Sequence, residues 1–190
     1  MRDGVLIGLA VAAFGGLGGV IMALRRSLAR ERALARTDDV TGVRNARAFR
    51  EAAAAEIERA RRYQHPFTVI CVDLGNRVGD GVLRFAAAAL RGALRATDLI
   101  ARLGRDEFIL LLPETPPPAG RLVLDKLRAA LADLRVAGDR PLVISLGGVT
   151  FLSQPGGVDD IIHATDERIA DARATGAPSH VTWNVVPGER

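Results

Sequence analysis

Two carboxylates stand beside a predicted hairpin turn near the middle of the 190-residue chain. Residues 95–112 contain two apolar runs separated by Gly104 and Arg105, and a Gly-X pair of this kind favours a two-residue β-hairpin turn. Asp106 and Glu107 open the second predicted strand. Carboxylate oxygens are suitable ligands for a divalent cation, so the turn hints at a metal site. An ordinary hairpin with charged turn residues is the alternative.

The other residues capable of metal or thiol chemistry do not form a recognisable site. The single cysteine, Cys71, lies in an apolar run without a disulfide partner, so we expect a small core residue in a reducing compartment. The histidines lie in unrelated predicted elements without the spacing of metal ligands, and surface or turn positions explain them. These residues are His65, His163 and His180.

Positive charge is concentrated at the N-terminus. The chain has 26 basic and 22 acidic residues, and residues 1–36 hold six arginines against two acids. The rest of the chain is therefore neutral, with 20 residues of each sign. A nucleic-acid-binding face needs clustered charge on the folded domain, so we expect no nucleic-acid partner. An anionic lipid surface suits the N-terminal charge better.

An uncharged apolar stretch, residues 4–24, is long enough to cross a membrane as a helix. Arg25 and Arg26 follow it at once. At the other end Arg2 is offset by Asp3, so the positive-inside rule predicts a single-pass protein of the inner membrane with its C-terminal domain in the cytoplasm. A cleaved signal peptide is the alternative, but the apolar run is long and lacks a small-residue cleavage site.

The chain is expected to divide into four segments. Small residues spaced four apart in the apolar stretch, such as Gly15 and Gly19, would let two such helices approach closely, which favours a homodimer. The segments are a transmembrane helix with a short flank at 1–25, a basic juxtamembrane stalk at 26–37, a folded domain at 38–186 and a tail at 187–190.

Helical and strand-like patterns alternate through the folded domain. An apolar, β-branched run at 67–72 has the pattern of a buried strand and ends at Asp73, and Asp80 is the expected N-cap of the next helix. This α+β order around a central hairpin favours a mixed sheet flanked by helices. Helices are predicted at 46–63, 81–94, 120–134 and 158–174, and further strands at 142–145 and 181–185.

Five short motifs follow one another along the folded domain: DDVTGVRNARAF at 38–49, the strand-ending Asp73, GRDEF at 104–108, SLGGV at 145–149 and ATDERIADARATG at 164–176. In these motifs and their order, residues 38–186 resemble the GGDEF domain, the diguanylate cyclase family. The resemblance implies a fold related to the palm of nucleotide cyclases, in which two GTP-loaded domains face each other to make cyclic di-GMP. It also implies Asp73 and Asp106 as ligands of Mg²⁺ or Mn²⁺, with Glu107 beside them in the catalytic site.

The resemblance is weaker in the residues that would bind the guanine base of the substrate. The family carries a guanine-reading segment after the Asp73 position, whereas only LGNRV at 74–78 precedes the next helix here. The interval is about ten residues short, and loss of base-reading hydrogen bonds costs on the order of 10⁴-fold in discrimination. Asn76 is the one residue in the interval that could imitate a guanine contact, and a loop turn residue is the alternative.

Two further positions depart from the family pattern. Arg105 replaces the second signature glycine and places a long side chain where backbone should approach the nucleotide. Arg173 replaces a lysine and could still bind a phosphate, but the Arg-Asn pair that follows in the family is Ala177 and Pro178 here. Together these changes argue against turnover.

An Arg-x-x-Asp motif, Arg95 to Asp98, is followed by five residues and then by Gly104 of the GRDEF motif, an offset that matches the family's inhibitory site for cyclic di-GMP. A planar guanidinium can bond a phosphate or a guanine edge through two N–H groups, and a carboxylate can accept from guanine. The alternative is structural, because a helix C-terminus favours a cation and a turn favours a short acid.

The sequence thus favours a membrane-anchored, degenerate GGDEF domain that binds cyclic di-GMP at Arg95 and Asp98 or pairs with other proteins. An active diguanylate cyclase that uses GTP with Mg²⁺ or Mn²⁺ is the first alternative. A dimeric membrane scaffold that binds no nucleotide is the second.

Overall fold

The computed structural model describes residues 22, 35–75, 78–136, 140–174 and 180–187. The chain divides into two compact units, Met1–Ala35 and Arg36–Arg190, and the folded elements belong to the second. The predicted transmembrane helix and most of the predicted stalk lie outside the described residues. Among the residues that are described, no helix is long and apolar enough to cross a membrane.

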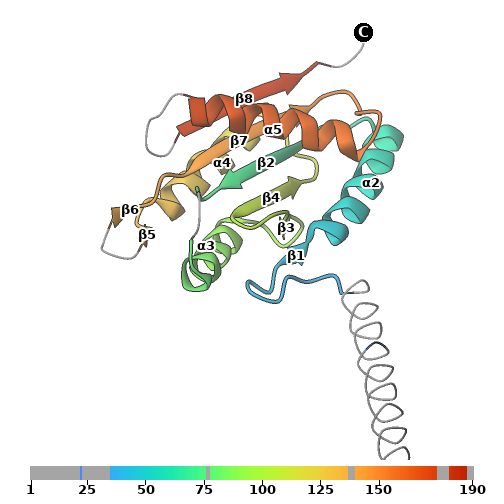
Figure 1. Ribbon diagram of the computed structural model, residues 1–190. Helices are drawn as coiled ribbons and strands as arrows, with labels where there is room; N and C mark the ends of the chain where they lie inside the picture. The colour runs from blue at the N-terminus through green and yellow to red at the C-terminus, as the bar shows by residue number, and fades with distance from the viewer. Residues whose placement is uncertain (1–21, 23–34, 76–77, 137–139, 175–179, 188–190) are drawn as a thin grey trace, which may run out of the picture. The chain divides into compact units, whose positions relative to one another are not determined.

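A mixed β-sheet forms the centre of the folded unit (Figure 1). Six strands of the described residues follow one another in the order β1-β3-β4-β2-β7-β8. The inner pairs are antiparallel, whereas β1 pairs with β3, and β7 with β8, in parallel. The strands are β1 Arg44–Asn45, β2 Phe67–Asp73, β3 Leu99–Arg102, β4 Glu107–Leu112, β7 Ser145–Phe151 and β8 His180–Val186, with a separate small pair, β5 Arg135–Val136 and β6 Arg140–Pro141.

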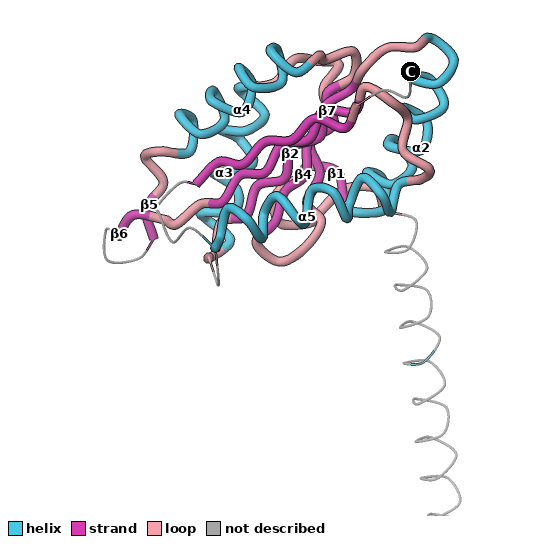
Figure 2. The backbone as a smooth tube through the Cα atoms, turned by 90° about the horizontal axis from the view of Figure 1, so that it is seen from above, coloured by secondary structure: helices cyan, strands magenta, loops and turns pink. Residues whose placement is uncertain are grey.

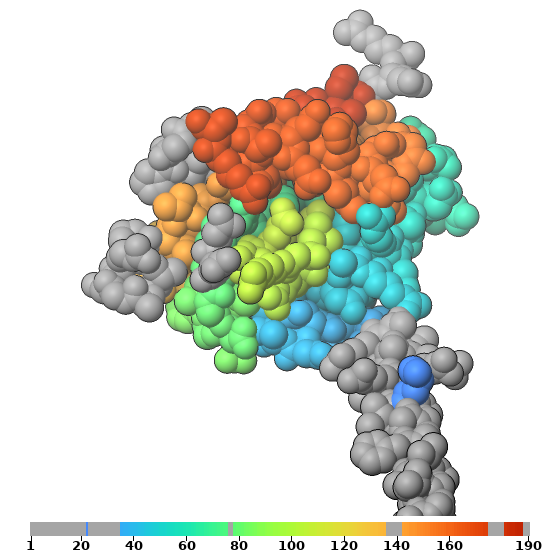
Figure 3. Space-filling view, in the orientation of Figure 1, coloured from blue at the N-terminus to red at the C-terminus, as the bar shows by residue number. Residues whose placement is uncertain are grey.

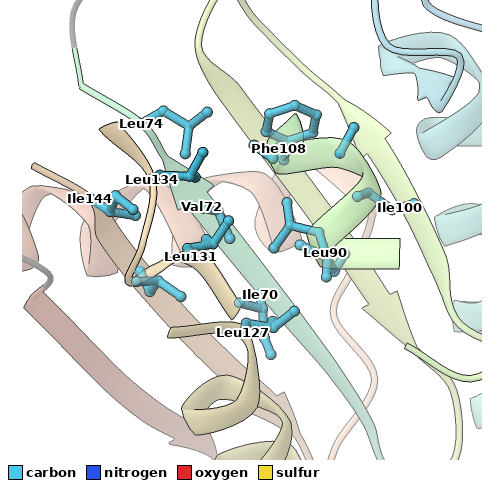
Figure 4. Packing of buried hydrophobic residues seen from close by; sticks show 14 of the residues in the cluster. Ile70, Val72, Leu74, Leu90, Ile100, Phe108, Leu127, Leu131, Leu134 and Ile144 are labelled. Atoms are coloured by element: carbon cyan, nitrogen blue, oxygen red, sulfur yellow. The ribbon is translucent and has the colours of Figure 1, made fainter. Parts of the chain in front are cut away.

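Helices cover both faces of this sheet, as Figure 2 shows from above. Alternate residues of β2 point to opposite faces, so Ile70 and Val72 pack with α3 and α4, while Phe67 and Val69 pack with α2 and α5. The first of these layers is drawn in Figure 4. The helices are α2 Ala46–Tyr63, α3 Asp80–Ala93, α4 Pro117–Leu131 and α5 Val158–Ala174. The predicted α+β sheet flanked by helices is therefore confirmed.

The strand predicted at 142–145 is wrong, because β7 runs over Ser145–Phe151 and every residue in it is buried. Gly147 and Gly148, in the SLGGV motif, lie inside this strand and serve close packing. A Cβ at Gly147 would lie 2.7 Å from the Cβ of Arg168 in α5, and one at Gly148 would overlap the ring of Trp183 in β8. The two glycines allow a helix on one face and an indole on the other to approach the strand.

Two local predictions also need correction. Gly79, not Asp80, is the N-cap of α3, and Asp80 lies in the first helical turn, where its charge still favours the helix dipole. The hairpin connection is longer than two residues, because β3 ends at Arg102 and β4 begins at Glu107. We call residues 103–106, which join these strands, the signature turn.

Candidate functional site

The end of β2 lies beside the signature turn. Asp73 is the register partner of Glu107 in β4, and the Leu74 amide donates to the Asp106 carbonyl oxygen at 3.0 Å. Asp73 and Asp106 are 6% and 9% exposed. The sheet therefore brings Asp73 beside Asp106 and Glu107, which lie more than 30 residues later in the sequence, as the positions of the strand and the hairpin predicted.

Arg102 holds the signature turn in place. Its Nε donates to the Gly104 carbonyl at 3.1 Å, and its Nη2 donates to the Arg105 carbonyl at 2.6 Å. Its Nη1 lies 3.0 and 3.1 Å from the two carboxylate oxygens of Asp38. Figure 3 shows the yellow-green segment near residue 105 at the surface, between α5 and the blue segment near residue 40. One guanidinium thus ties the turn to the segment before β1.

The Asp38 carboxylate accepts hydrogen bonds from Thr41 as well as from Arg102. Its Oδ1 accepts from the Thr41 amide at 2.8 Å and from the Thr41 hydroxyl at 2.6 Å. Burial alone would raise the pKa of Asp38, but the hydrogen bonds from Thr41 and Arg102 outweigh burial and leave that pKa below its ordinary value. The carboxylate is therefore held in its ionised form.

Asp73 is engaged through both of its carboxylate oxygens. Oδ1 accepts from the Gly75 amide at 2.8 Å, in a turn where Gly75 has a φ of +72° that suits glycine. Oδ2 accepts from Arg173 Nε at 2.5 Å and also contacts Arg173 Nη2. The arginine proposed as a phosphate ligand thus forms an ion pair with the acid proposed as a metal ligand.

Glu107 lies next to this ion pair in a negative environment. Burial raises the pKa of Glu107, and the nearby Asp166 and Asp73 raise it further, against the opposing effects of Cys71 and Arg173. The Cys71 thiol donates to Glu107 Oε1 at 3.6 Å, and burial holds the pKa of that thiol well above its ordinary value. Cys71 is therefore an inert core thiol, as its apolar surroundings predicted.

A second candidate site surrounds Arg95, just after α3. Asp98 Oδ2 accepts from the Arg95 amide at 2.8 Å, and the Asp98 amide donates to the Arg95 carbonyl at 3.1 Å, so a tight turn brings the two together. They line a cavity of about 300 Å³ together with Arg44 and Arg91. Within the part of the chain that the structure describes, the Arg95 guanidinium makes no hydrogen bond or ion pair.

A family profile described as "Diguanylate cyclase, GGDEF domain" matches residues 35–179, which is most of the chain and nearly all of the folded unit. The chain belongs to the GGDEF family. It is 33% identical over 159 residues to the diguanylate cyclase DgcP of Pseudomonas aeruginosa, covering 77% of this chain and 24% of that protein. It is 27% identical over 168 residues to the response regulator PleD of Caulobacter vibrioides, covering 80% of this chain and 37% of that protein.

Solved structures agree with this assignment of the fold. The diguanylate cyclase SiaD of Pseudomonas aeruginosa, solved with its activator SiaC, has a TM-score of 0.69 at 25% identity, covering 96% of this chain and 77% of SiaD. The GGDEF domain of DgcB from Caulobacter crescentus, solved with cyclic di-GMP, has a TM-score of 0.69 at 18% identity, covering 78% of this chain and 92% of that one. The chain spans 24% and 37% of the two curated relatives, so their activities describe longer proteins.

Asp73, one of the two acids that the resemblance implies as metal ligands, already has protein partners. Asp73 already binds Arg173 and the Gly75 amide. Among the described residues, no group of three or more His, Cys, Asp or Glu side chains is arranged to hold a metal ion. A metal ion at Asp73 would have to displace the Arg173 guanidinium first.

Several residues of the predicted site remain without structural evidence. Asn76, Ala177 and Pro178 lie outside the described residues. The interval between β2 and α3 consists of residues 74–79, and Leu74 in it is fully buried. The side chain of His163 is 78% exposed, which agrees with the expected surface position, whereas that of His65, in the loop between α2 and β2, is 16% exposed.

Sequence reasoning missed Arg102, Arg91 and Arg44. Arg102 immediately precedes the signature turn, so its position could have suggested a role in holding that turn. Arg91 precedes Arg95 by four residues, the spacing of one helical turn, and this could have marked it as a second cation of the same site. Arg44 belongs to the first motif, and the parallel pairing of β1 with β3 brings that motif to this edge of the sheet.

Proposed function

We propose that this chain is a membrane-anchored GGDEF domain that binds cyclic di-GMP in the cavity beside Arg95 and does not synthesise it. The observation that carries the proposal is an exposed guanidinium with no protein partner among the described residues, set in a cavity that two further arginines line. A side chain without an internal partner is available to a ligand without first breaking an ion pair.

The charge of the cavity suits a phosphodiester with attached guanines. Three arginines, Arg44, Arg91 and Arg95, face one acid, Asp98, so the cavity is positive overall. A guanidinium can bond a phosphate or a guanine edge through parallel N–H groups. A cavity of about 300 Å³ is at the small end for a ligand pocket, so we expect it to hold one half of the dinucleotide.

The other half of the proposal, the lack of synthesis, is supported by the Asp73–Arg173 ion pair and by the short interval at 74–79. Phosphoryl transfer needs carboxylates that are free to hold the metal ions of a nucleoside triphosphate. In this chain the first such carboxylate is neutralised by Arg173. The short interval leaves six residues in which to read a guanine base.

Titration calorimetry of the 190-residue chain with cyclic di-GMP tests the binding. We expect saturable heat, and Arg95→Ala should weaken binding by at least about tenfold because a charged bidentate contact contributes roughly 1.5–3 kcal/mol. Arg84→Ala is the matched control, because Arg84 is an exposed arginine of α3 outside the cavity. Absence of heat, or equal loss in both variants, would remove the receptor function and leave the nucleotide-independent scaffold.

A diguanylate cyclase is the second candidate, and the register that sets Asp73 opposite Glu107 favours it. Incubation of the full chain with GTP and Mg²⁺ or Mn²⁺, in a bilayer that permits a homodimer, tests this function. We expect no cyclic di-GMP. Product that disappears in Asp106→Ala would establish the cyclase and show that the Asp73–Arg173 ion pair opens in the presence of substrate.

A further inference from the structure

The last strand, β8, forms one edge of the central sheet (Figure 1). All seven of its residues are register partners of β7 on one side, and among the described residues no strand pairs with it on the other side. The opposite edge of the sheet is β1, which has two residues. β8 is therefore the longer edge, and its outer backbone groups extend along the whole strand.

One hydrogen bond shows which residues of β8 turn their backbone groups away from β7. The Val186 carbonyl accepts from the amide of Leu152, the residue after β7, at 3.0 Å, so the backbone groups of Val186 face β7. Successive residues of a strand turn these groups to opposite sides. The backbone groups of Val181, Trp183 and Val185 therefore face outward, away from the sheet.

The outward groups of β8 are mostly unpaired within the described part of the chain. The Val185 amide donates to Asn184 Oδ1 at 2.8 Å, which agrees with its outward direction. No described residue forms a hydrogen bond with the outward groups of Val181 and Trp183. Proteins commonly protect such an edge with charged residues, with proline or by keeping the strand very short. β8 is seven residues long, and its sequence HVTWNVV contains no Lys, Arg, Asp, Glu or Pro.

Two copies of β8 complement each other when they run antiparallel about a two-fold axis at Trp183. Trp183 then faces its own counterpart, and Val181 faces Val185 of the other copy, so that outward amides meet outward carbonyls. Identical strands do not repel each other here, because β8 carries no acidic or basic side chain of fixed charge. The side chains of Val181 and Trp183 lie partly buried against the core, and cross-strand neighbours would cover them further. The Val185 amide would have to release Asn184.

We propose that the β8 edge is an interaction surface for a second copy of this chain, which adds its own β8 antiparallel to the first and joins the two sheets into one. The same surface is used on both copies, so the contact closes as a dimer. It belongs to the folded unit alone and is separate from both the Arg95 cavity and the proposed N-terminal span.

Amide hydrogen exchange of the full chain in mild detergent, measured by NMR at low and high protein concentration, tests the pairing. We expect the Val181 and Trp183 amides to exchange at least tenfold more slowly at high concentration, because strand pairing protects them. The Thr182 amide faces β7 and should be protected at both concentrations. Asn184→Lys should abolish the concentration-dependent protection, because it places a charge on each edge. Leu122→Lys, at an exposed position of α4, should retain it.

Disulfide formation tests the register. Pairing about Trp183 places residue 182 of one copy opposite residue 184 of the other in a non-hydrogen-bonded pair, where the two Cα atoms lie about 4.5 Å apart, within the reach of a disulfide. A mixture of Thr182→Cys and Asn184→Cys chains should therefore form a linked dimer far more readily than either variant alone. The native Cys71 is buried and should not compete. Asn184→Cys mixed with Leu122→Cys controls for random collision.

Equal exchange of the Val181 and Trp183 amides at both concentrations would overturn the inference, as would protection that persists in Asn184→Lys or equal cross-linking in the control mixture. A cooperative thermal transition checks that each variant folds. A dimer held by the proposed span alone would leave the two outward amides unprotected, so the measurement separates it from strand pairing. None of these outcomes depends on cyclic di-GMP binding, so the receptor proposal stands or fails independently.

Discussion

At the scale of single residues, Arg102 connects the signature turn to Asp38, in the segment before β1. It is 12% exposed, and its guanidinium serves Asp38 and two carbonyl groups of the turn. We expect Arg102→Ala to lower the free energy of unfolding by about 2–3 kcal/mol, because it leaves a partly buried carboxylate and two carbonyls without their charged donor. Urea denaturation measures this loss.

The pH dependence of this loss identifies its cause. Because the pKa of Asp38 is lowered on folding, the contribution of the ion pair is present above the ordinary pKa of 3.8 and disappears as the pH falls through the lower, folded value. The difference between wild type and Arg102→Ala should therefore be constant above about pH 5 and shrink below it. A difference that stays the same in acid would mean that Arg102 acts through packing and not through Asp38. Arg105→Ala, an exposed neighbour, is the control.

Glu56 is a second residue whose charge affects stability. Its ionised form destabilises the folded domain, whereas ionised Asp38 stabilises it. Burial raises the pKa of Glu56 above its ordinary 4.5, and among the described residues its Oε1 has no hydrogen-bond partner, with His65 Nδ1 at 3.9 Å. Its favourable contribution is present below pH 4.5 and is lost as the pH rises through the folded pKa. Glu56→Gln should thus stabilise the domain at pH 7, by about 1 kcal/mol.

The measurement is urea denaturation between pH 4 and pH 8, compared with Glu58→Gln. Glu58 belongs to the same helix, and its side chain is 68% exposed, so its substitution should leave the pH profile unchanged. The gain from Glu56→Gln should vanish near pH 4, where the wild-type carboxyl is protonated as well. A gain that does not depend on pH would show that the neutral side chain packs better and that the charge is irrelevant.

At the scale of elements, the contact between β7 and α5 depends on Gly147. An added Cβ would stand 2.7 Å from the Cβ of Arg168, and the backbone of α5 leaves little room for adjustment. Gly147→Ala should therefore lower the free energy of unfolding by about 1–3 kcal/mol through overpacking. In contrast, an added Cβ at Gly92 in α3 would have no atom of the described residues within 4 Å. Gly92→Ala should raise stability by about 0.5–1 kcal/mol, because alanine costs less chain entropy in a helix.

Chemical denaturation of both glycine variants, with the slope checked for constancy, measures these effects. We expect a lower free energy of unfolding for Gly147→Ala and a higher one for Gly92→Ala. Destabilisation by both substitutions would mean that helix propensity and the space around the added Cβ do not decide the change in stability. The close approach of α5 to β7 would then not explain the glycine at position 147.

The same elements explain what could be predicted from the sequence. The helices and β2 were predictable because each shows a strong apolar period or a β-branched run, and the α+β order followed from them. β7 was misplaced because two glycines conceal a buried strand, and their purpose appears only when Arg168 and Trp183 are packed against them. The three acids at the end of β2 were found from motifs, but the Asp73–Arg173 ion pair joins side chains from elements far apart in the chain, and local patterns do not report it.

At the scale of the whole molecule, the remaining prediction concerns the N-terminal residues 4–24, whose composition suits a membrane span. We expect the full chain to sediment with membranes and to resist extraction by alkaline carbonate. An arginine at the centre of a spanning helix costs about 2.5–3.5 kcal/mol, so Val11→Arg combined with Leu17→Arg should move the chain to the soluble fraction. Val11→Ile combined with Leu17→Ile preserves the apolar character and should leave the chain in the membrane.

The membrane location that we propose for the chain bears on its proposed ligand. By the positive-inside rule, protease added outside intact spheroplasts should leave the GGDEF domain uncut, because the arginines after the proposed span would keep that end in the cytoplasm. Cyclic di-GMP binding by the Arg95 cavity should then be equal for the membrane-bound chain and the released double-arginine variant, since the cavity belongs to the folded unit alone. Weaker binding by the released variant would show that the span contributes to the site, as a homodimer held together in the membrane would require.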